Sequence, residues 1–434
     1  MNYRLNYSQE AVRLQRVLLP RSGEDTLAFR LDFRDGFDIA AMKQAVALLS
    51  ERHDCLRLSF TGWGFFLRQH FAPSREPVPI QELSFEDQAE EEAFCKGFVN
   101  EPLSMHKGET MKLLFLSRPY AVPAIVVKLS HYAADLYGAG VMVSDLISVY
   151  EAILRGGKLP PAPEDFETVL LRDMDSAARR RDRDFFRKYI SRQPRPLYCG
   201  FDGGKKHRSP YYIPFDRLHQ EAVRYSFDLP SSTLERLVDY VSGSGYSVSS
   251  ILFYACTIAS SMQYKKAENI SAMLLVHCRT RSSERNCAGS KVQALPAFLT
   301  VDYGKSFLEN LAALRGDMNE LYRHTRYPFI RANMMLHLKW LFPPMGYIYS
   351  FCFSYFPQKL PDGLNMYLYN RDRVSQLSFI IAQHDFTSNT MTIHLLARRK
   401  LLDSARAKAF MDRLVDVLDK VLAAPDQALG KILL

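Results

Sequence analysis

A single histidine lies where an apolar run ends, in the stretch "VVKLSHYAADLYGAGVMVSDL" from Val126 to Leu146. The run at 123–130 is strand-like, 136–140 is a turn rich in small residues, and 141–153 has a helical pattern. His131 is therefore expected at the carboxyl end of a strand, where a side chain can face a cleft on a rigid backbone. A neutral imidazole can accept a proton near pH 7, which makes His131 a candidate general base. The alternative is a core histidine that bonds a backbone carbonyl.

Few other residues have a spacing that suggests chemistry. The strand-like run "SFCFSYF" places Ser350, Cys352 and Ser354 on one face. Ser354 could line a channel or donate a hydrogen bond to an oxyanion, although ordinary strand packing explains the same pattern. Neither a glycine-rich phosphate loop nor a G-x-S-x-G elbow occurs. We expect no metal site, because metal-ligand spacing is lacking among His277, His324, His337, His384 and His394.

The segments that must position these residues form two halves that begin alike. The run "TLAFRLDF" is strand-like, Asp38 is a candidate N-cap, and a helical face follows it. Much later "AVRYSFDLP" is strand-like again, and Ser232 with Glu235 forms a candidate capping box before another helix. Further strands are predicted at 347–356, 365–370, 376–384 and 390–397. Strands mixed with helices in both halves predict an α/β or α+β layered fold.

The boundary between the halves is predicted from composition. Residues 164–190 are charged and helical in pattern, and the residues after them bring prolines and glycines close together with little periodicity. We therefore expect an N-terminal lobe at 1–191, a linker at 192–222 and a C-terminal lobe at 223–434. The length of 434 residues is too great for one ordinary core and fits two lobes of roughly 200 residues each.

Composition and charge limit the class of protein and its partners. With 47% hydrophobic and 24% charged residues, the chain has the composition of a globular protein, and we expect no membrane span or signal sequence. Seven dispersed cysteines without a C-x-x-C pair favour reduced thiols in the cytoplasm. The formal net charge of +9 leaves room for an acidic partner. Aspartates interleave the arginine-rich run "ARRRDRDFFRKYISRQPR", which favours a solvated helix over nucleic-acid binding.

Two motifs carry a resemblance to a known family. The segment "SHYAADLYGAG" resembles the H-H-x-x-x-D-G segment of the condensation domains of nonribosomal peptide synthetases and of related CoA-dependent acyltransferases. Ser130 stands at the first histidine, His131 at the second, Asp135 at the aspartate and Leu136 at the glycine.

The second motif lies at 274–315, which is similar to that family's strand ending in Gly-Arg and to its Gly-x-x-x-Asn-x-Leu-Pro stretch. Arg279 stands at the arginine and Cys278 at the preceding glycine, while Gln293 stands at the asparagine. The openings of both halves and the segment 398–429 also resemble the family, so the resemblance covers nearly the whole chain.

The resemblance implies a V-shaped pair of chloramphenicol-acetyltransferase-like lobes with a tunnel between them. An acyl group would enter as a thioester on CoA or on the phosphopantetheine of an acidic carrier protein, and an amine or alcohol would enter from the other side. His131 would be the general base. Asp135 with Arg279 would be a structural pair across the lobes, and Ser130 would support the loop. Ser354 and Gln293 are candidates for the tunnel wall.

Two departures from the family pattern leave an alternative open. Ser130 replaces a histidine, and Leu136 replaces a glycine that could be needed where φ is positive. The alternative is a non-catalytic module that docks a carrier protein or partner enzyme on the same fold. Under the enzymatic interpretation we expect a stand-alone cytoplasmic monomer without a tightly bound cofactor, because the chain has no room for a carrier or adenylation domain.

Overall fold

The computed structural model describes residues 1–18, 25–74, 77–174, 176–195, 201, 221–264, 266–341, 348–369 and 378–433. These residues belong to two compact units. The first comprises Met1–Ser176, His277–Val292 and Lys359–Asp372, and the second comprises Ala177–Val276, Gln293–Gln358 and Arg373–Leu434. Neither unit is one continuous stretch, unlike the lobes expected at 1–191 and 223–434. The linker expected at 192–222 lies for the most part outside the described residues.

The first unit is built around a mixed sheet with strand order β11-β1-β6-β5-β4. Its strands are β1 (Thr26–Phe33), β4 (Ile80–Ser84), β5 (Met111–Ser117), β6 (Ala124–Ser130) and β11 (Leu364–Leu368). A separate hairpin pairs β2 (Leu58–Thr61) with β3 (Arg68–Phe71). The helices are α1 (Tyr7–Leu18), α2 (Ile39–Arg52), α3 (Gln88–Asn100), α4 (Leu136–Leu154) and α5 (Phe166–Asp173), with short 3-10 turns at η1 (Asp54–Arg57), η2 (Gly64–Phe66), η3 (Met105–Lys107) and η5 (Ser283–Asn286).

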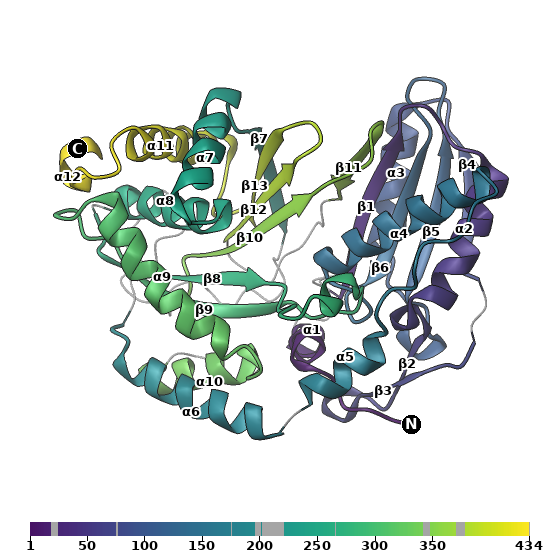
Figure 1. Ribbon diagram of the computed structural model, residues 1–434, viewed down its shortest axis with the longest axis horizontal. Helices are drawn as coiled ribbons and strands as arrows, with labels where there is room; N and C mark the ends of the chain where they lie inside the picture. Colours follow the sequence, from purple (N-terminus) through teal and green to yellow (C-terminus); the bar gives the residue numbers. More distant parts are fainter. Residues whose placement is uncertain are drawn as a thin grey trace. The chain divides into compact units, whose positions relative to one another are not determined.

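Strand β6 lies inside this unit and is buried along its whole length. Its Ile, Val and Val residues suit a strand that is packed on both faces. Figure 1 shows α2 and α4 over one face of the sheet and α3 over the other, and α3 packs against the face that carries Leu114 and Val126. The strand therefore ends at a rigidly held residue, Ser130.

Helix α4 is the one helix among the described residues that is long and apolar enough to cross a bilayer by length and composition alone. It packs beside α2, and its inner face, which includes Met142, Val143 and Leu146, is buried. These contacts make it a core helix of the first unit.

The second unit has a larger sheet with strand order β7-β13-β12-β10-β8-β9. The strands are β7 (Ala222–Asp228), β8 (Asn269–Val276), β9 (Gln293–Thr300), β10 (Phe351–Gln358), β12 (Ser378–Asp385) and β13 (Thr390–Arg398). Its helices are α6 (Ser176–Arg192), α7 (Ser231–Ser244), α8 (Val248–Gln263), α9 (Phe307–Arg323), α10 (Phe329–Trp340), α11 (Ser404–Ala423) and α12 (Leu429–Leu433). A sheet in each unit, with helices packed on it, confirms the predicted mixed α/β class, while the V shape and the tunnel stay predictions.

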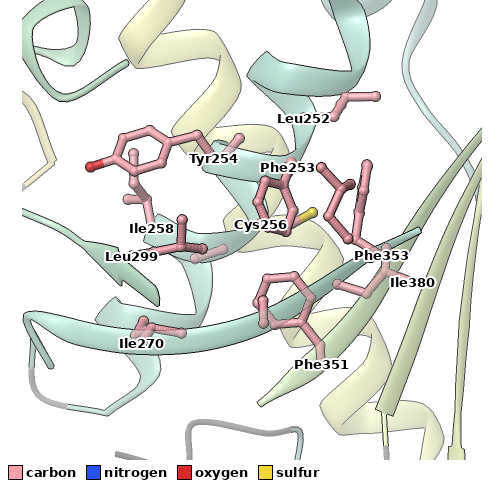
Figure 2. Close-up of a cluster of buried hydrophobic side chains, with 14 of the residues drawn as sticks. Leu252, Phe253, Tyr254, Cys256, Ile258, Ile270, Leu299, Phe351, Phe353 and Ile380 are labelled. Atoms are coloured by element: carbon pink, nitrogen blue, oxygen red, sulfur yellow. The ribbon is translucent and has the colours of Figure 1, made fainter. Parts of the chain in front are cut away.

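The core of the second unit forms between its sheet and α8, which is buried from Ile251 to Ser261. Figure 2 shows Phe351 and Phe353 of β10 and Ile380 of β12 directed toward the side chains of α8. The arginine-rich run lies in α6, whose Phe186 is buried in the same core. None of the cysteines that the structure describes forms a disulfide.

The helix caps agree only in part with the sequence. Asp38 caps α2 as predicted, since its side chain accepts a hydrogen bond from the Ala41 amide at 2.7 Å. The capping box predicted at Ser232 and Glu235 is wrong, because α7 already begins at Ser231 and Ser232 lies inside its first turn. A capping box forms instead at the start of α9, between Ser306 and Glu309.

Candidate active site

His131 is the first residue after β6, at the strand end where the sequence places it. Its side chain is half-buried. Its backbone N–H donates to the carbonyl oxygen of Asp25 at 2.8 Å, next to the last β1–β6 pair, Thr26 with Ser130. The backbone of the candidate base is thus fixed by the neighbouring strand.

Ser130 closes the turn that carries His131. The residue is 2% exposed, and its Oγ accepts a hydrogen bond from the Tyr132 amide at 3.3 Å. Its carbonyl oxygen accepts from the amides of Ala133 at 3.0 Å and Ala134 at 3.1 Å. A hydroxyl therefore supplies a local hydrogen bond at the position where the resemblance would place a histidine.

Asp135 caps α4 and joins it to a distant segment of the chain. Its Oδ1 accepts from the Gly138 amide at 2.7 Å, and its Oδ2 accepts from the Lys291 amide at 2.7 Å. Leu136 is the first residue of α4 and is not among the residues with a positive φ. The backbone at this position therefore does not require the glycine of the family pattern.

Arg279 binds Asp135 through both terminal nitrogens of its guanidinium. The Nη1–Oδ2 distance is 3.0 Å, and the Nη2–Oδ1 distance is 3.1 Å. Its remaining N–H groups donate to the carbonyl oxygens of Cys287, His277 and Gly289. All five donors of the guanidinium are used, as a buried cation requires.

The Asp135–Arg279 pair lies within the first unit, which corrects the expectation that it bridges two lobes. The reason is that His277–Val292 packs with the N-terminal part of the chain although it follows a strand of the second unit. Burial raises the pKa of Asp135, but the charge of Arg279 and hydrogen bonds from Arg279, Gly138 and Lys291 outweigh it and hold the pKa below its usual value.

The segment 287–291 closes against the histidine turn. Gly289 forms an isolated bridge with Ala134, and the Ser290 amide donates to the carbonyl oxygen of Ala133 at 3.2 Å. These contacts fix the turn in addition to the hydrogen bond from His131 to Asp25, so two separate chain segments hold the residues around His131.

Two glycines permit this close approach, and sequence reasoning missed both. A Cβ at Gly138 would lie 1.8 Å from the carbonyl oxygen of Ala288, and one at Gly289 would lie 1.9 Å from the ring of Phe166. The small residues of "LYGAG" were a visible signal, but they lie in the first turn of α4 rather than in a separate turn.

Lys291 forms a second buried ion cluster beside Asp135, also missed by the sequence. Its Nζ lies 3.3 Å from Asp173 and 3.4 Å from Glu284, and all three side chains are buried. Burial raises the pKa of Glu284. The charge of Lys291 and hydrogen bonds from Lys291 and from the amides of Thr280 and Arg281 outweigh burial, so the pKa lies below its usual value. This cluster ties α5 and η5 to the segment that contacts the histidine turn.

Gln293 and Ser354, the two candidates for a tunnel wall, belong to the second unit. The Gln293 amide nitrogen donates to the carbonyl oxygens of Thr325 and Tyr327, and its Oε1 accepts from the Phe329 amide. Gln293 thus fixes the turn before α10. Ser354 is half-buried in β10. Their role beside a substrate stays a prediction.

The structure brings Ser130, His131, Asp135 and Arg279 together in one unit. Among the residues it describes, no cluster of three or more His, Cys, Asp or Glu side chains could hold a metal ion. What the arrangement offers chemically is an imidazole at a strand end, on a turn whose shape is fixed by a fully bonded carboxylate–guanidinium pair.

Comparisons with known proteins identify relatives of this chain. A family model of the condensation domain matches residues 2–434. The hybrid PKS-NRPS synthetase ucsA of an Acremonium species is 20% identical over 425 residues, which cover 94% of this chain and 10% of that protein. A linear gramicidin synthase of Brevibacillus parabrevis is 29% identical over 141 residues, which cover 30% of this chain and 3% of that protein. The chain spans a tenth or less of the curated relatives it matches.

Solved condensation domains have the same fold. The first condensation domain of the calcium-dependent antibiotic synthetase, in complex with a substrate analogue, matches with a TM-score of 0.80 and 16% identity over 100% of this chain and 98% of that chain. A mutant of the starter condensation domain of rhizomide synthetase RzmA, in complex with C8-CoA and Leu-SNAC, matches with a TM-score of 0.80 and 18% identity over 99% of this chain and 96% of that chain.

Proposed function

The chain belongs to the condensation-domain family, and we propose that it transfers an acyl group from a CoA or phosphopantetheine thioester to an amine or hydroxyl acceptor, with His131 as the general base. The family forms amides and esters from thioesters. The observation that carries the proposal is the placement of His131 on a turn that β1, the segment 287–291 and the Asp135–Arg279 pair all hold in place.

The chemistry needs one proton transfer that an imidazole can perform. As the acceptor nitrogen or oxygen attacks the thioester carbonyl, a C–N or C–O bond forms and the acceptor must lose a proton. His131 takes this proton, the C–S bond breaks, and the sulfur leaves as a thiol after protonation. A positioned base of this kind contributes about 10²- to 10⁴-fold, and alignment of the two substrates supplies much of the rest.

The thioester donor is supported by a relative. A mutant of the RzmA starter condensation domain was solved in complex with C8-CoA and Leu-SNAC. CoA and carrier proteins share the phosphopantetheine arm, so either could present the acyl group to this chain. The net charge of +9 suits both an acidic carrier protein and the phosphates of CoA.

The test is acyl transfer measured on His131→Ala with a matched thioester and acceptor. Turnover should fall at least about 10²-fold, while folding and thioester binding stay nearly unchanged, because only the transition-state interaction is removed. Ser130→Ala is the matched control one residue away and should have a much milder effect. If His131→Ala keeps most of its activity, catalysis rests on substrate positioning and the proposed role of His131 is wrong.

A second candidate is a non-catalytic module that docks a carrier protein or partner enzyme. Ser130 in place of the family histidine and Cys278 in place of the family glycine favour it. A parent protein that binds thioesters or carrier proteins but turns over none of a panel of donors would establish this alternative.

A further inference from the structure

Three large aromatic side chains are exposed together at the tip of the β2–β3 hairpin. Trp63 is 74% exposed, Phe65 63% and Phe66 81%. The residues that flank them are buried, since Phe60 of β2 is 3% exposed and Leu67, just before β3, is 5% exposed. Apolar side chains that gather on a surface in this way mark an interaction site, whereas scattered ones do not.

The tip has a defined shape. Gly62 and Gly64 adopt left-handed backbones with φ of +78° and +54°, and a Cβ at Gly62 would lie 2.5 Å from the carbonyl oxygen of Phe66. The Phe66 amide donates to the carbonyl oxygen of Trp63 at 3.0 Å. The chain reversal therefore depends on its glycines and holds the aromatic residues outward.

Neighbouring elements support the tip from two sides. The guanidinium of Arg13, on α1, lies 5.4 Å from the ring centre of Phe65 and donates to the Phe65 carbonyl oxygen at 3.3 Å. The ring of His106, in η3, lies 4.0 Å from that of Trp63. Because these contacts already order the Trp63 and Phe65 rings, less conformational entropy is lost when the tip binds a partner.

Basic residues stand next to the tip in the chain and on the elements that contact it. Arg68 follows the tip on β3 and is exposed, and so is Lys107, next to His106. Two carboxylates of the adjoining elements are neutralised within the unit, since Asp25 pairs with Arg16 at 2.8 Å and Glu109 lies 3.5 Å from Lys112. The tip thus combines apolar rings with positive charge.

We propose that the β2–β3 tip is an anchor for the surface of a bilayer that contains anionic lipid. Trp and Phe rings gain a favourable environment at the headgroup level, and Arg and Lys side chains are attracted to the negative leaflet. A protruding tip can enter a fluid interface without a groove of matching shape. This inference goes beyond the proposed acyl transfer and does not depend on it.

The test uses the full chain and the fluorescence of Trp63. The protein has two tryptophans, so Trp340→Phe leaves Trp63 as the reporter. On vesicles of phosphatidylcholine with about 30% phosphatidylserine, a composition that mimics an anionic leaflet, its emission should shift to the blue and be quenched by brominated lipid. Pure phosphatidylcholine vesicles should bind less, and raised salt should weaken binding to the anionic vesicles.

Co-sedimentation with the same vesicles distinguishes binding through the tip from non-specific binding through other exposed apolar side chains. Trp63→Ser with Phe66→Ser should weaken partitioning at least about tenfold, because two apolar contacts with the interface are lost. The matched control is Met334→Ser with Leu338→Ser on α10, where the side chains are 58% and 73% exposed. Arg68→Gln with Lys107→Gln should remove most of the preference for anionic lipid.

The proposal is overturned if the wild-type protein does not bind these vesicles, or if the tip and α10 variants lose binding equally. If the wild-type protein does not bind vesicles, the exposed aromatic residues of the tip are better explained as a contact site for another protein.

Discussion

Cys278 adopts a left-handed backbone conformation, with φ of +50°, directly before Arg279. For a residue with a Cβ this conformation costs roughly 1–2 kcal/mol, whereas glycine adopts it without that strain. The resemblance placed a family glycine at this position. The guanidinium of Arg279 lies 4.5 Å from the ring centre of Tyr137, which stacks on His277, so the strained residue lies beside the site.

We predict that Cys278→Gly is more stable than Cys278→Ala. Both variants remove the thiol, but only glycine relieves the backbone. Strain relief of roughly 1–2 kcal/mol, less about 0.5–1 kcal/mol for the greater freedom of unfolded glycine, gives an expected gain of about 0.5–1 kcal/mol. Urea unfolding of the two variants measures the difference, and equal free energies of unfolding would show that the site is not strained.

The sequence pattern was enough to predict where His131 lies, and the family resemblance predicted that Asp135 pairs with Arg279. Gly138, Gly289 and Lys291 were missed for a physical reason. Their importance comes from the approach of two segments about 150 residues apart, and a single sequence shows neither the approach nor the space that a Cβ would fill. Leu136 drew attention as a departure from the motif, yet an α-helical backbone accepts it.

At the scale of elements, three neighbouring strands share a hydrogen-bond chain that the sequence did not reveal. His394 on β13 contacts Ser226 on β7 through Nδ1 at 2.8 Å and Gln383 on β12 through Nε2 at 3.1 Å. Burial, and then the positive charge of Arg224, lower the pKa of His394 to about 4. A neutral ring satisfies both contacts, because Nε2–H donates to Gln383 and Nδ1 accepts from the Ser226 hydroxyl.

This chain of contacts predicts a pH dependence of stability. In the unfolded state the imidazole of His394 is protonated below about pH 6.5. In the folded state the same imidazole stays neutral until the pH falls to about 4. The free energy of unfolding should therefore fall as the pH drops from about 6.5 to about 4, by up to about 3 kcal/mol from this group. His394→Gln should show a shallower slope in the same window. Parallel curves for the two proteins would contradict the prediction.

Element types were predicted better than element partners. The strand-like segment predicted at 365–370 overlaps β11, whose first four residues alternate between buried and exposed in the structure. The pattern does not say which sheet a strand joins. β11 pairs with β1 in the first unit, with Phe29 opposite Leu368, although it comes from the part of the chain expected to form the second lobe.

At the scale of the whole molecule, the first unit depends on two segments from the C-terminal half of the sequence. The segment 277–292 provides Arg279 and the Lys291 amide to Asp135, and β11 covers the edge of β1. The N-terminal part therefore contains the candidate base but not all the residues that fix its turn. The lobe expected at 1–191 therefore needs residues from the part of the chain that was expected to form the second lobe.

We predict that residues 1–195 alone do not unfold cooperatively, whereas co-expression with residues 196–434 restores a folded complex. In the fragment, the Asp135 carboxylate loses Arg279, and breaking a buried ion pair on one side costs about 3–5 kcal/mol. β1 also becomes an open edge that favours aggregation. Thermal unfolding followed by circular dichroism compares the fragment, the complex and the intact chain. The fragment carrying Asp135→Asn, which removes the unpaired charge, should recover part of the loss. If the unmodified fragment melts cooperatively near the temperature of the intact chain, the late segments are dispensable and this account of the first unit is wrong.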